Sequence, residues 1–217
     1  LGGRVTREAK LPGLAEWARV RDWRLTQIDK LTTVEVFPQS PMTADSVLEL
    51  GVSRVLIATG AKWAKDAVGR HSDIGFTQTD PTMIVTGDKI LDGSKINGKK
   101  IVIYDDDHYY FGSVCALELR KRGHEVVLIT PAGRVCGWGA YTDEQEASTH
   151  ALIKAGVEII TNKTIDTVAS GRAELSCVFS NNPSTIACDA VVPLTRKIPV
   201  TDLYDDLIYN KNRYTEA

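Results

Sequence analysis

The alternation of apolar and polar positions between Lys99 and Pro131 predicts one strand–loop–helix–strand unit. Ile101 to Tyr104 is a short apolar run rich in β-branched residues, which is typical of a buried parallel strand. Val114 to Lys121 has apolar positions among good helix formers, and Gly123 ends that helix. Glu125 to Thr130 is the second strand. This order of elements predicts the opening of a Rossmann-type dinucleotide fold and places the chain in the α/β class.

The same periodicities predict further elements along the chain. Helices are expected at Gly13 to Leu31, Ala44 to Leu50, Asp88 to Leu91, Thr142 to Ala155 and Leu203 to Tyr209. Strands are expected at Val34 to Phe37, Val52 to Gly60, Met83 to Val85, Val157 to Ile160, Thr164 to Val168, Leu175 to Phe179 and Asp189 to Leu194. The short strands near residues 157–179 indicate a small antiparallel flap on the parallel sheet. Thr43 is expected to cap its helix, and Thr142 and Gln145 have the spacing of a capping box.

The loop from Asp105 to Ser113 differs from a pyrophosphate-binding loop. Such a loop needs glycines, so that the backbone can approach the phosphates, and it needs little negative charge. Here three carboxylates and three aromatic residues accompany the single Gly112. We therefore interpret the unit as a dinucleotide fold without its dinucleotide. The alternatives are a loop that binds a nucleotide by another route, or a solvated acidic turn before a helix N-terminus.

Composition and charge narrow the function only slightly. The 217 residues are 43% hydrophobic and 25% charged with a net charge of −2, which gives no argument for a nucleic-acid partner. No apolar stretch is long enough for a transmembrane helix, and no secretory signal is present. The four cysteines have no metal-binding spacing, which favours buried thiols in a reducing cytoplasm. The first residues resemble the middle of a domain, so we expect a fragment.

No catalytic motif is evident in the sequence. It contains no Ser-His-Asp order, no HExxH and no Walker loop. His71, His124 and His150 occupy a polar loop, a helix-ending turn and a helix, where structural roles are the common ones. His108 is better placed, because it follows a strand at the carboxyl edge of the sheet, where α/β proteins hold their ligands. Redox chemistry would require a bound cofactor.

Several segments together resemble one family. They are LGGRV, LPGLAEW followed by RDWRLTQI, PMTADSVLELG, VLIATGAKW, IVIYDDDHYYFGS and GHEVVLIT. In this order they resemble the trimethylamine, dimethylamine and histamine dehydrogenase group, whose more distant relatives include 2,4-dienoyl-CoA reductase. The resemblance covers nearly the whole chain, and the linked segments are far more specific than any one of them.

The resemblance implies FAD/NAD(P)-binding-like Rossmann folds. Residues 1–95 and 188–217 would form a truncated FAD/ADP-binding-like domain, and residues 96–187 an inserted NAD(P)H-binding-like domain. In the family a preceding barrel carries FMN and a [4Fe-4S] cluster, so the 217 residues alone are expected to be inactive. Gly2, Gly3 and Arg4 would lie beside the ribose and pyrophosphate of ADP or FAD, which this fragment would bind weakly. A second set, Ala58, Thr59, Gly60 and Trp63, would line the same cleft.

The function implied by the resemblance is that of a cytoplasmic amine dehydrogenase. The whole enzyme, expected to be a homodimer, would oxidatively demethylate or deaminate an amine and pass electrons to an electron-transferring flavoprotein. This portion would be structural, with Trp17 and Trp23 near the docking surface of the electron acceptor. The alternatives are a reductase portion with working FAD and NAD(P)H domains, or a stand-alone nucleotide-binding module without a redox role.

Overall fold

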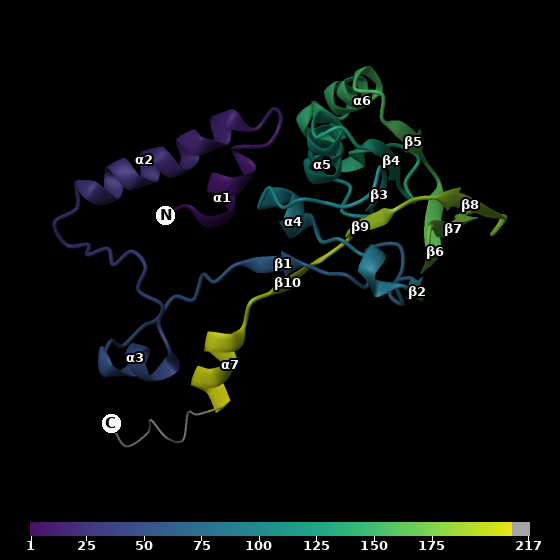
Figure 1. Cartoon of the computed structure of the whole chain (residues 1–217). Coiled ribbons are helices and arrows are strands. Elements are labelled where there is room, and N and C mark those ends of the chain that lie inside the picture. The colour runs from purple at the N-terminus through teal and green to yellow at the C-terminus, as the bar shows by residue number, and fades with distance from the viewer. Residues whose placement is uncertain (210–217) are drawn as a thin grey trace.

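A four-stranded parallel sheet lies at the centre of the structure, a computed structural model that describes residues 1–209 (Figure 1). The sheet has the order β5-β4-β3-β9. Its strands are β3 (Lys100–Asp105), β4 (Glu125–Ile129), β5 (Glu158–Ile160) and β9 (Ala190–Leu194). The α/β class predicted from the sequence is confirmed, as are the two strands and the helix of the first predicted unit.

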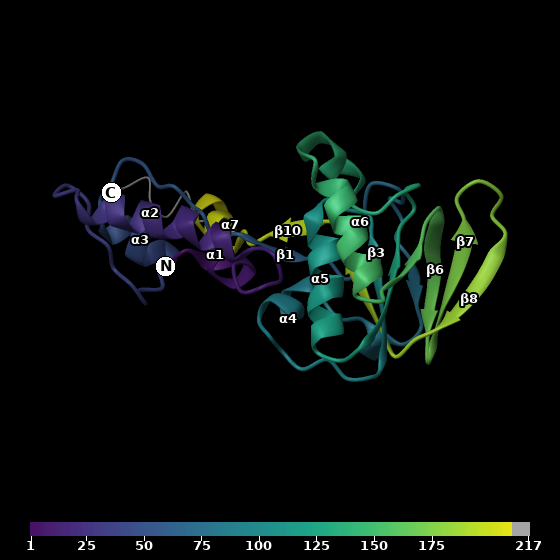
Figure 2. The same cartoon turned by 90° about the horizontal axis from the view of Figure 1, so that it is seen from above.

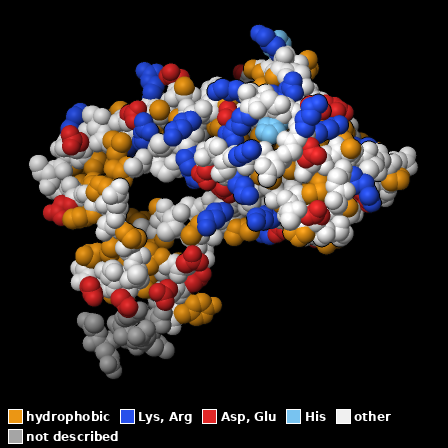
Figure 3. Space-filling view, viewed as in Figure 1, with side chains coloured by type: hydrophobic (Ala, Val, Ile, Leu, Met, Phe, Trp, Pro, Cys, Tyr) orange, Lys and Arg blue, Asp and Glu red, His pale blue; other side chains and the backbone are white. Residues whose placement is uncertain are grey.

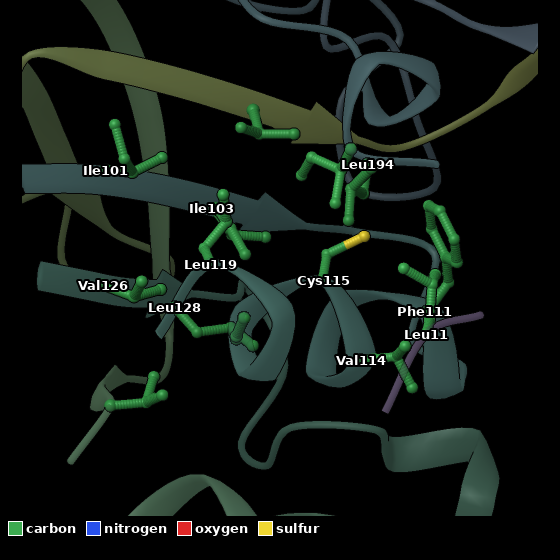
Figure 4. Packing of buried hydrophobic residues seen from close by; sticks show 14 of the residues in the cluster. Leu11, Ile101, Ile103, Phe111, Val114, Cys115, Leu119, Val126, Leu128 and Leu194 are labelled. Atoms are coloured by element: carbon green, nitrogen blue, oxygen red, sulfur yellow. The ribbon is translucent and has the colours of Figure 1, made fainter. Parts of the chain in front are cut away.

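Helices cover one face of this sheet and a second sheet covers the other (Figure 2). Ile101 and Ile103 of β3 pack against α5 (Tyr110–Lys121), and Leu152 of α6 (Glu144–Lys154) joins the same cluster (Figure 4). Val102 and Tyr104 point the opposite way and pack with Val168 and Leu175 of the second sheet. Because successive strand residues face opposite sides, a strand that is apolar at every position must be covered twice.

The second sheet has the order β2-β6-β7-β8 and forms the predicted antiparallel flap. The prediction was wrong for Val157 to Ile160, because β5 pairs in parallel with β4 of the central sheet. Its strands are β2 (Thr77–Gln78), β6 (Lys163–Ala169), β7 (Arg172–Cys177) and β8 (Pro183–Ala187). β6, β7 and β8 pair antiparallel, whereas β2 joins β6 in parallel. The polar sequence of β8 gave no strand signal, because its side chains, except Ile186, are exposed at the sheet edge.

The remaining elements form an arm that extends from the sheets (Figure 1). The arm contains α1 (Gly3–Glu8), the 3₁₀ turn Ala15–Trp17, α2 (Ala18–Asp29), α3 (Ala44–Glu49) and α7 (Asp202–Tyr209). The chain enters the sheets through β1 (Ala61–Trp63) and leaves through β10 (Lys197–Pro199), and these two strands pair antiparallel. Figure 3 shows an open gap between the part with α1 and α2 and the part with α3 and α7.

Two predicted strands in the arm are absent. Residues 34–37 and 52–60 have no strand pairing, and most of their apolar side chains are exposed. Leu56 is 99% exposed. A strand requires a neighbour for its backbone N–H and C=O groups, and the described residues supply none to these two segments. The predictions were therefore wrong for this chain, although the residue pattern is that of buried strands.

Several smaller predictions also changed. Residues 81–83 form a 3₁₀ turn, and only Ile84 makes an isolated bridge, to Val191. α5 begins at Tyr110, four residues earlier than predicted. The capping box before α6 was wrong, because Asp143 precedes that helix in a left-handed conformation and Thr142 bonds Glu144 instead. Thr43 caps α3 as predicted, and α4 (Gly87–Leu91) matches the short helix expected there. The predicted domain boundaries stay a prediction.

Candidate functional site

The Arg4 side chain is the centre of a cluster between the arm and the sheet. Its Nε donates to Glu8 on the next turn of α1, and the Tyr110 hydroxyl donates to the other Glu8 oxygen at 3.0 Å. The Arg4 guanidinium lies over two rings, 5.6 Å from the centre of Trp63 and 5.0 Å from that of Phe111. Glu8 is buried although it carries a carboxylate, and these two donors compensate it.

Trp63 closes this cluster from the β1–β10 ribbon. Its indole stacks on Phe111 with ring centres 5.2 Å apart, and Lys197 Nζ lies 4.8 Å from the Trp63 ring. The Trp63 backbone N–H donates to Asp88 at 2.7 Å. Burial and the nearby Arg4 charge lower the pKa of Lys197. The cluster thus holds two cations against one aromatic pair.

The structure brings together only some of the predicted cofactor residues. Arg4 and Trp63 meet in the cluster. Gly2 has a φ of +95° before α1, where a side chain would overlap Arg21, and Gly3 has a φ of +45° with open space around it. Ala58 to Gly60 lie at the exposed start of the ribbon, where the Thr59 hydroxyl donates to the Val200 carbonyl at 2.5 Å.

A groove runs beside these residues along the ribbon. It has a volume of about 640 Å³ and is lined by residues of both strands, including Trp63 and Ile198, and by Lys65 and Val200 beside them. Among the predicted residues only Trp63 borders it. The partners that the sequence did not reveal are Glu8, Tyr110, Phe111 and Lys197. Of these four, only Glu8 could have been predicted from the sequence, because its i,i+4 spacing from Arg4 is that of an ion pair on a helix.

The turn between β3 and α5 is not the solvated acidic turn considered above. Asp105 and Asp106 are fully buried. Asp105 Oδ1 accepts from the backbone N–H groups of Asp107 and His108, each at 3.1 Å. Its other oxygen is packed so closely on α5 that a Cβ on Gly112 would overlap it. The Asp105 carboxylate thus occupies the space that the single glycine of the loop leaves.

The buried carboxylates are partly compensated from within the chain, because Asp105 Oδ2 and Asp106 Oδ1 accept no hydrogen bond from the described residues. Asp106 accepts from the His71 backbone N–H at 2.8 Å and lies 3.0 Å from His108 Nε2. Burial raises the pKa of Asp105 to about 7, although two backbone hydrogen bonds and His108 act in the opposite direction. His71 and His108 both lie at this edge of the sheet. The preference for His108 as a functional residue stays a prediction.

The four cysteines are free thiols. Cys115, Cys136 and Cys188 are buried and Cys177 is partly buried, and none of the four forms a disulfide. Within residues 1–209, no three His, Cys, Asp or Glu side chains group as metal ligands would. A helix long and apolar enough to cross a membrane is also absent from this part of the chain.

Comparison with known proteins connects these features to one family. A family model described as the OYE-like second alpha/beta domain matches residues 85–201, more than half of the chain. The chain belongs to this family. Dimethylamine dehydrogenase from Hyphomicrobium sp. (strain x) is 32% identical, over 98% of this chain and 32% of its own length. The resemblance to the amine dehydrogenase group is confirmed.

Solved structures of two family relatives have the same fold. Histamine dehydrogenase from Rhizobium sp. 4-9 superimposes with a TM-score of 0.94 and 39% identity, covering 100% of this chain and 34% of its own. The 6-hydroxypseudooxynicotine amine oxidase from Pseudomonas geniculata N1 has a TM-score of 0.93 and 32% identity, covering 98% of this chain and 32% of its own. The chain therefore spans about a third of the length of these relatives.

Proposed function

We propose that this chain is the nucleotide-domain portion of a longer flavoprotein that oxidises an amine. The names of the relatives support an oxidoreductase acting on amines. In the whole protein, an FMN in a separate barrel would take electrons from the amine during demethylation or deamination. A [4Fe-4S] cluster would pass them to an electron-transferring flavoprotein. The role of the present portion would be structural.

The fold supports a truncated FAD-like domain with an inserted NAD(P)H-like domain of Rossmann type. The parallel order β5-β4-β3-β9 and the crossover helix α5 supply the core of the inserted unit. The arm and ribbon supply elements of the FAD-like unit. Residues 34–37 and 52–60 have the sequence of parallel strands, which supports a sheet completed by chain outside these residues.

The Arg4–Trp63 cluster supports a bound ADP or FAD. Arg4 Nη2 and Trp63 Nε1 are buried and have no hydrogen-bond partner among the described residues. Both are donors, and a nucleotide offers phosphate and ribose oxygens as acceptors. These two side chains would hold the nucleotide, with Gly3 leaving room beside them. Such a small set of donors supports weak binding by this portion alone.

The β3–α5 turn carries the second half of the proposal, a structural role without NAD(P)H. Dinucleotide folds keep this turn open for the pyrophosphate at the helix N-terminus. Here Asp105 occupies it and takes two of its backbone N–H groups. A pyrophosphate would meet a buried carboxylate where it needs donors. This is the observation that disfavours a reductase with a working NAD(P)H domain.

The tryptophans in the arm bear on the electron-accepting partner. The ring centres of Trp17 and Tyr110 are 5.1 Å apart, so Trp17 packs beside the Arg4 cluster. Trp23, in contrast, is 63% exposed. Exposed tryptophan is common at the centre of protein interfaces. We place the docking site of an electron-transferring flavoprotein around Trp23, on an enzyme that we expect to be a cytoplasmic homodimer.

The first test is the mass and visible spectrum of the protein purified from its native source. We expect a chain several times longer than 217 residues, with flavin and iron–sulfur absorption. A colourless native protein of about this mass would refute the amine dehydrogenase and leave the stand-alone module.

The nucleotide part is tested by titrating ADP into the same purified protein after its nucleotide has been removed. We expect saturable binding that Arg4→Gln weakens about tenfold, since it removes a charge-assisted hydrogen bond. Arg19→Gln is the matched control, because Arg19 pairs only with Glu16 on the surface. Equal affinity in both variants would contradict the role of Arg4. Tight, turnover-linked NADH binding would favour the reductase.

A further inference from the structure

A small cavity lies at the carboxyl edge of the parallel sheet, apart from the Arg4 cluster. It has a volume of about 190 Å³ and is lined by Arg70, His71, His108, Pro131 and Ala132. His108 follows β3 and Pro131 follows β4, so the cavity lies where parallel α/β sheets bind their ligands. Three of its five lining side chains are cationic or can become so, and none is a carboxylate.

The Arg70 side chain is prepared to bind an anion. Its guanidinium lies over the rings of Trp138 and Tyr109, at 5.3 and 6.0 Å from their centres. Stacking uses the face of the guanidinium and leaves its N–H groups, which point outward in its plane, for a ligand. No ion pair joins Arg70 to a carboxylate within residues 1–209. The Arg70 charge acts to lower the pKa of Asp107, although burial raises that pKa overall.

The His108 side chain has one ring nitrogen engaged and one unused. Nε2 lies 3.0 Å from Asp106, whereas Nδ1 is buried and has no partner in the described part of the chain. His108 itself has a φ of +65°, a conformation that is sparsely populated outside glycine. Asp105 holds it there by accepting from its backbone N–H. This hydrogen bond fixes the backbone from which the imidazole extends into the cavity wall.

The loop that carries Arg70 and His71 is fixed from the same side. Asp106 accepts from the His71 backbone N–H, and the Gly69 backbone N–H donates to the Ser72 carbonyl at 2.8 Å. A Cβ on Gly69 would overlap the Asp106 carboxylate, so the close approach requires this glycine. The buried acids therefore hold the backbone that carries His71 and His108 in place.

We propose that this cavity binds a small oxyanion, a phosphate or a carboxylate, between the Arg70 guanidinium and the His71 imidazole, with the His108 side chain as part of the cavity wall. Planar N–H donors match the paired oxygens of both anions. A volume of about 190 Å³ suits an ion of this size, whereas pockets for larger ligands measure roughly 300–1,000 Å³. The proposal concerns a different site from the ADP site and does not depend on it.

The test is titration of the intact protein with inorganic phosphate, followed by ³¹P line broadening and calorimetry. We expect saturable binding that Arg70→Gln and His71→Gln each weaken about tenfold. The His71 ring makes no hydrogen bond to any residue that the structure describes, so this substitution tests the site without disturbing the fold. Arg172→Gln is the matched control, since Arg172 pairs with Glu174 on the flap. Circular dichroism checks that each variant is folded.

Competition with acetate identifies the anion. Displacement of phosphate by acetate at similar concentration assigns a carboxylate-accepting site, and failure to displace assigns a phosphate site. Both outcomes support the proposal. It is overturned if neither anion binds saturably, or if Arg70→Gln binds phosphate as tightly as Arg172→Gln does. Excess ADP should not displace the phosphate, which separates this site from the one around Arg4.

Discussion

The central sheet and the arm contain strand-like sequences of the same kind, but only the central ones form strands. Ile103 of β3 is 0% exposed and its backbone pairs on both sides, whereas Leu56 in the arm is 99% exposed and its backbone pairs with no strand within residues 1–209. The difference lies in the neighbours and not in the residues. A β-branched apolar run specifies a strand only when partner strands are at hand to take its hydrogen bonds.

The largest expected effect is the loss of a core side chain. Ile103→Ala should lower the free energy of unfolding by roughly 2–5 kcal/mol, because it leaves a cavity in a packed sheet. Leu56→Ala is the matched change in the arm and should stay within about 0.5 kcal/mol. Urea unfolding of both variants measures the contrast. A comparable loss of stability in Leu56→Ala would contradict the difference between sheet and arm, since it would show that Leu56 is packed.

The second prediction concerns the buried Asp105. Its pKa is about 7 in the folded chain, against 3.8 for the ordinary group, so the folded state holds the proton more tightly. The contribution of Asp105 to the free energy of unfolding is therefore greatest below about pH 4. It decreases between about pH 4 and 7 and stays constant above pH 7. The fall is at most about 4 kcal/mol.

The measurement is urea unfolding across that pH range with Asp105→Asn beside the wild type. The variant should flatten the pH dependence, because its amide oxygen can still accept the two backbone hydrogen bonds without a charge. Asp73→Asn, at an exposed loop position, should leave the slope unchanged. An identical slope in wild type and Asp105→Asn would rule out Asp105 as its source.

Tight packing at the start of α5 gives a third prediction. Gly112→Ala would place a methyl group against the Asp105 carboxylate and should destabilise the chain by about 1–3 kcal/mol. Gly137→Ala is the control, because the nearest atom to its new Cβ would be Arg134 Cγ at 3.7 Å. Thermal unfolding compares the two. Equal melting temperatures would show that the β3–α5 turn has room to spare.

The smallest effect is expected in the arm. Thr43→Ala removes the hydroxyl that accepts from the Ser46 N–H and should cost about 1 kcal/mol of helix stability. Because α3 packs on little besides α7, the loss should appear as faster amide exchange in residues 46–49 and leave the global unfolding curve unchanged. Thr33→Ala is the control. A shift of the whole unfolding curve would show that arm and sheet unfold together.

Sequence reasoning succeeded where the controlling interactions are local or periodic. β3, α5 and β4 follow from apolar spacing and from the helix-ending Gly123, and Thr43 from its capping position. It failed for residues 34–37 and 52–60, because no strand among the described residues pairs with them. The candidate site was predicted only in part. The contact of Asp106 with His71 spans 35 positions, and nothing near either residue announces it.

The ribbon of β1 and β10 has a consequence for how such a chain can be assembled by evolution. Ala61 lies opposite Pro199 in the register, so the chain departs from the arm and returns to it at one point. The segment between Ala61 and Pro199 is therefore one long insertion relative to the arm, and its two ends are adjacent. Such a unit can be gained, exchanged or replaced by a tight turn through one genetic insertion or deletion, without moving either end of the host.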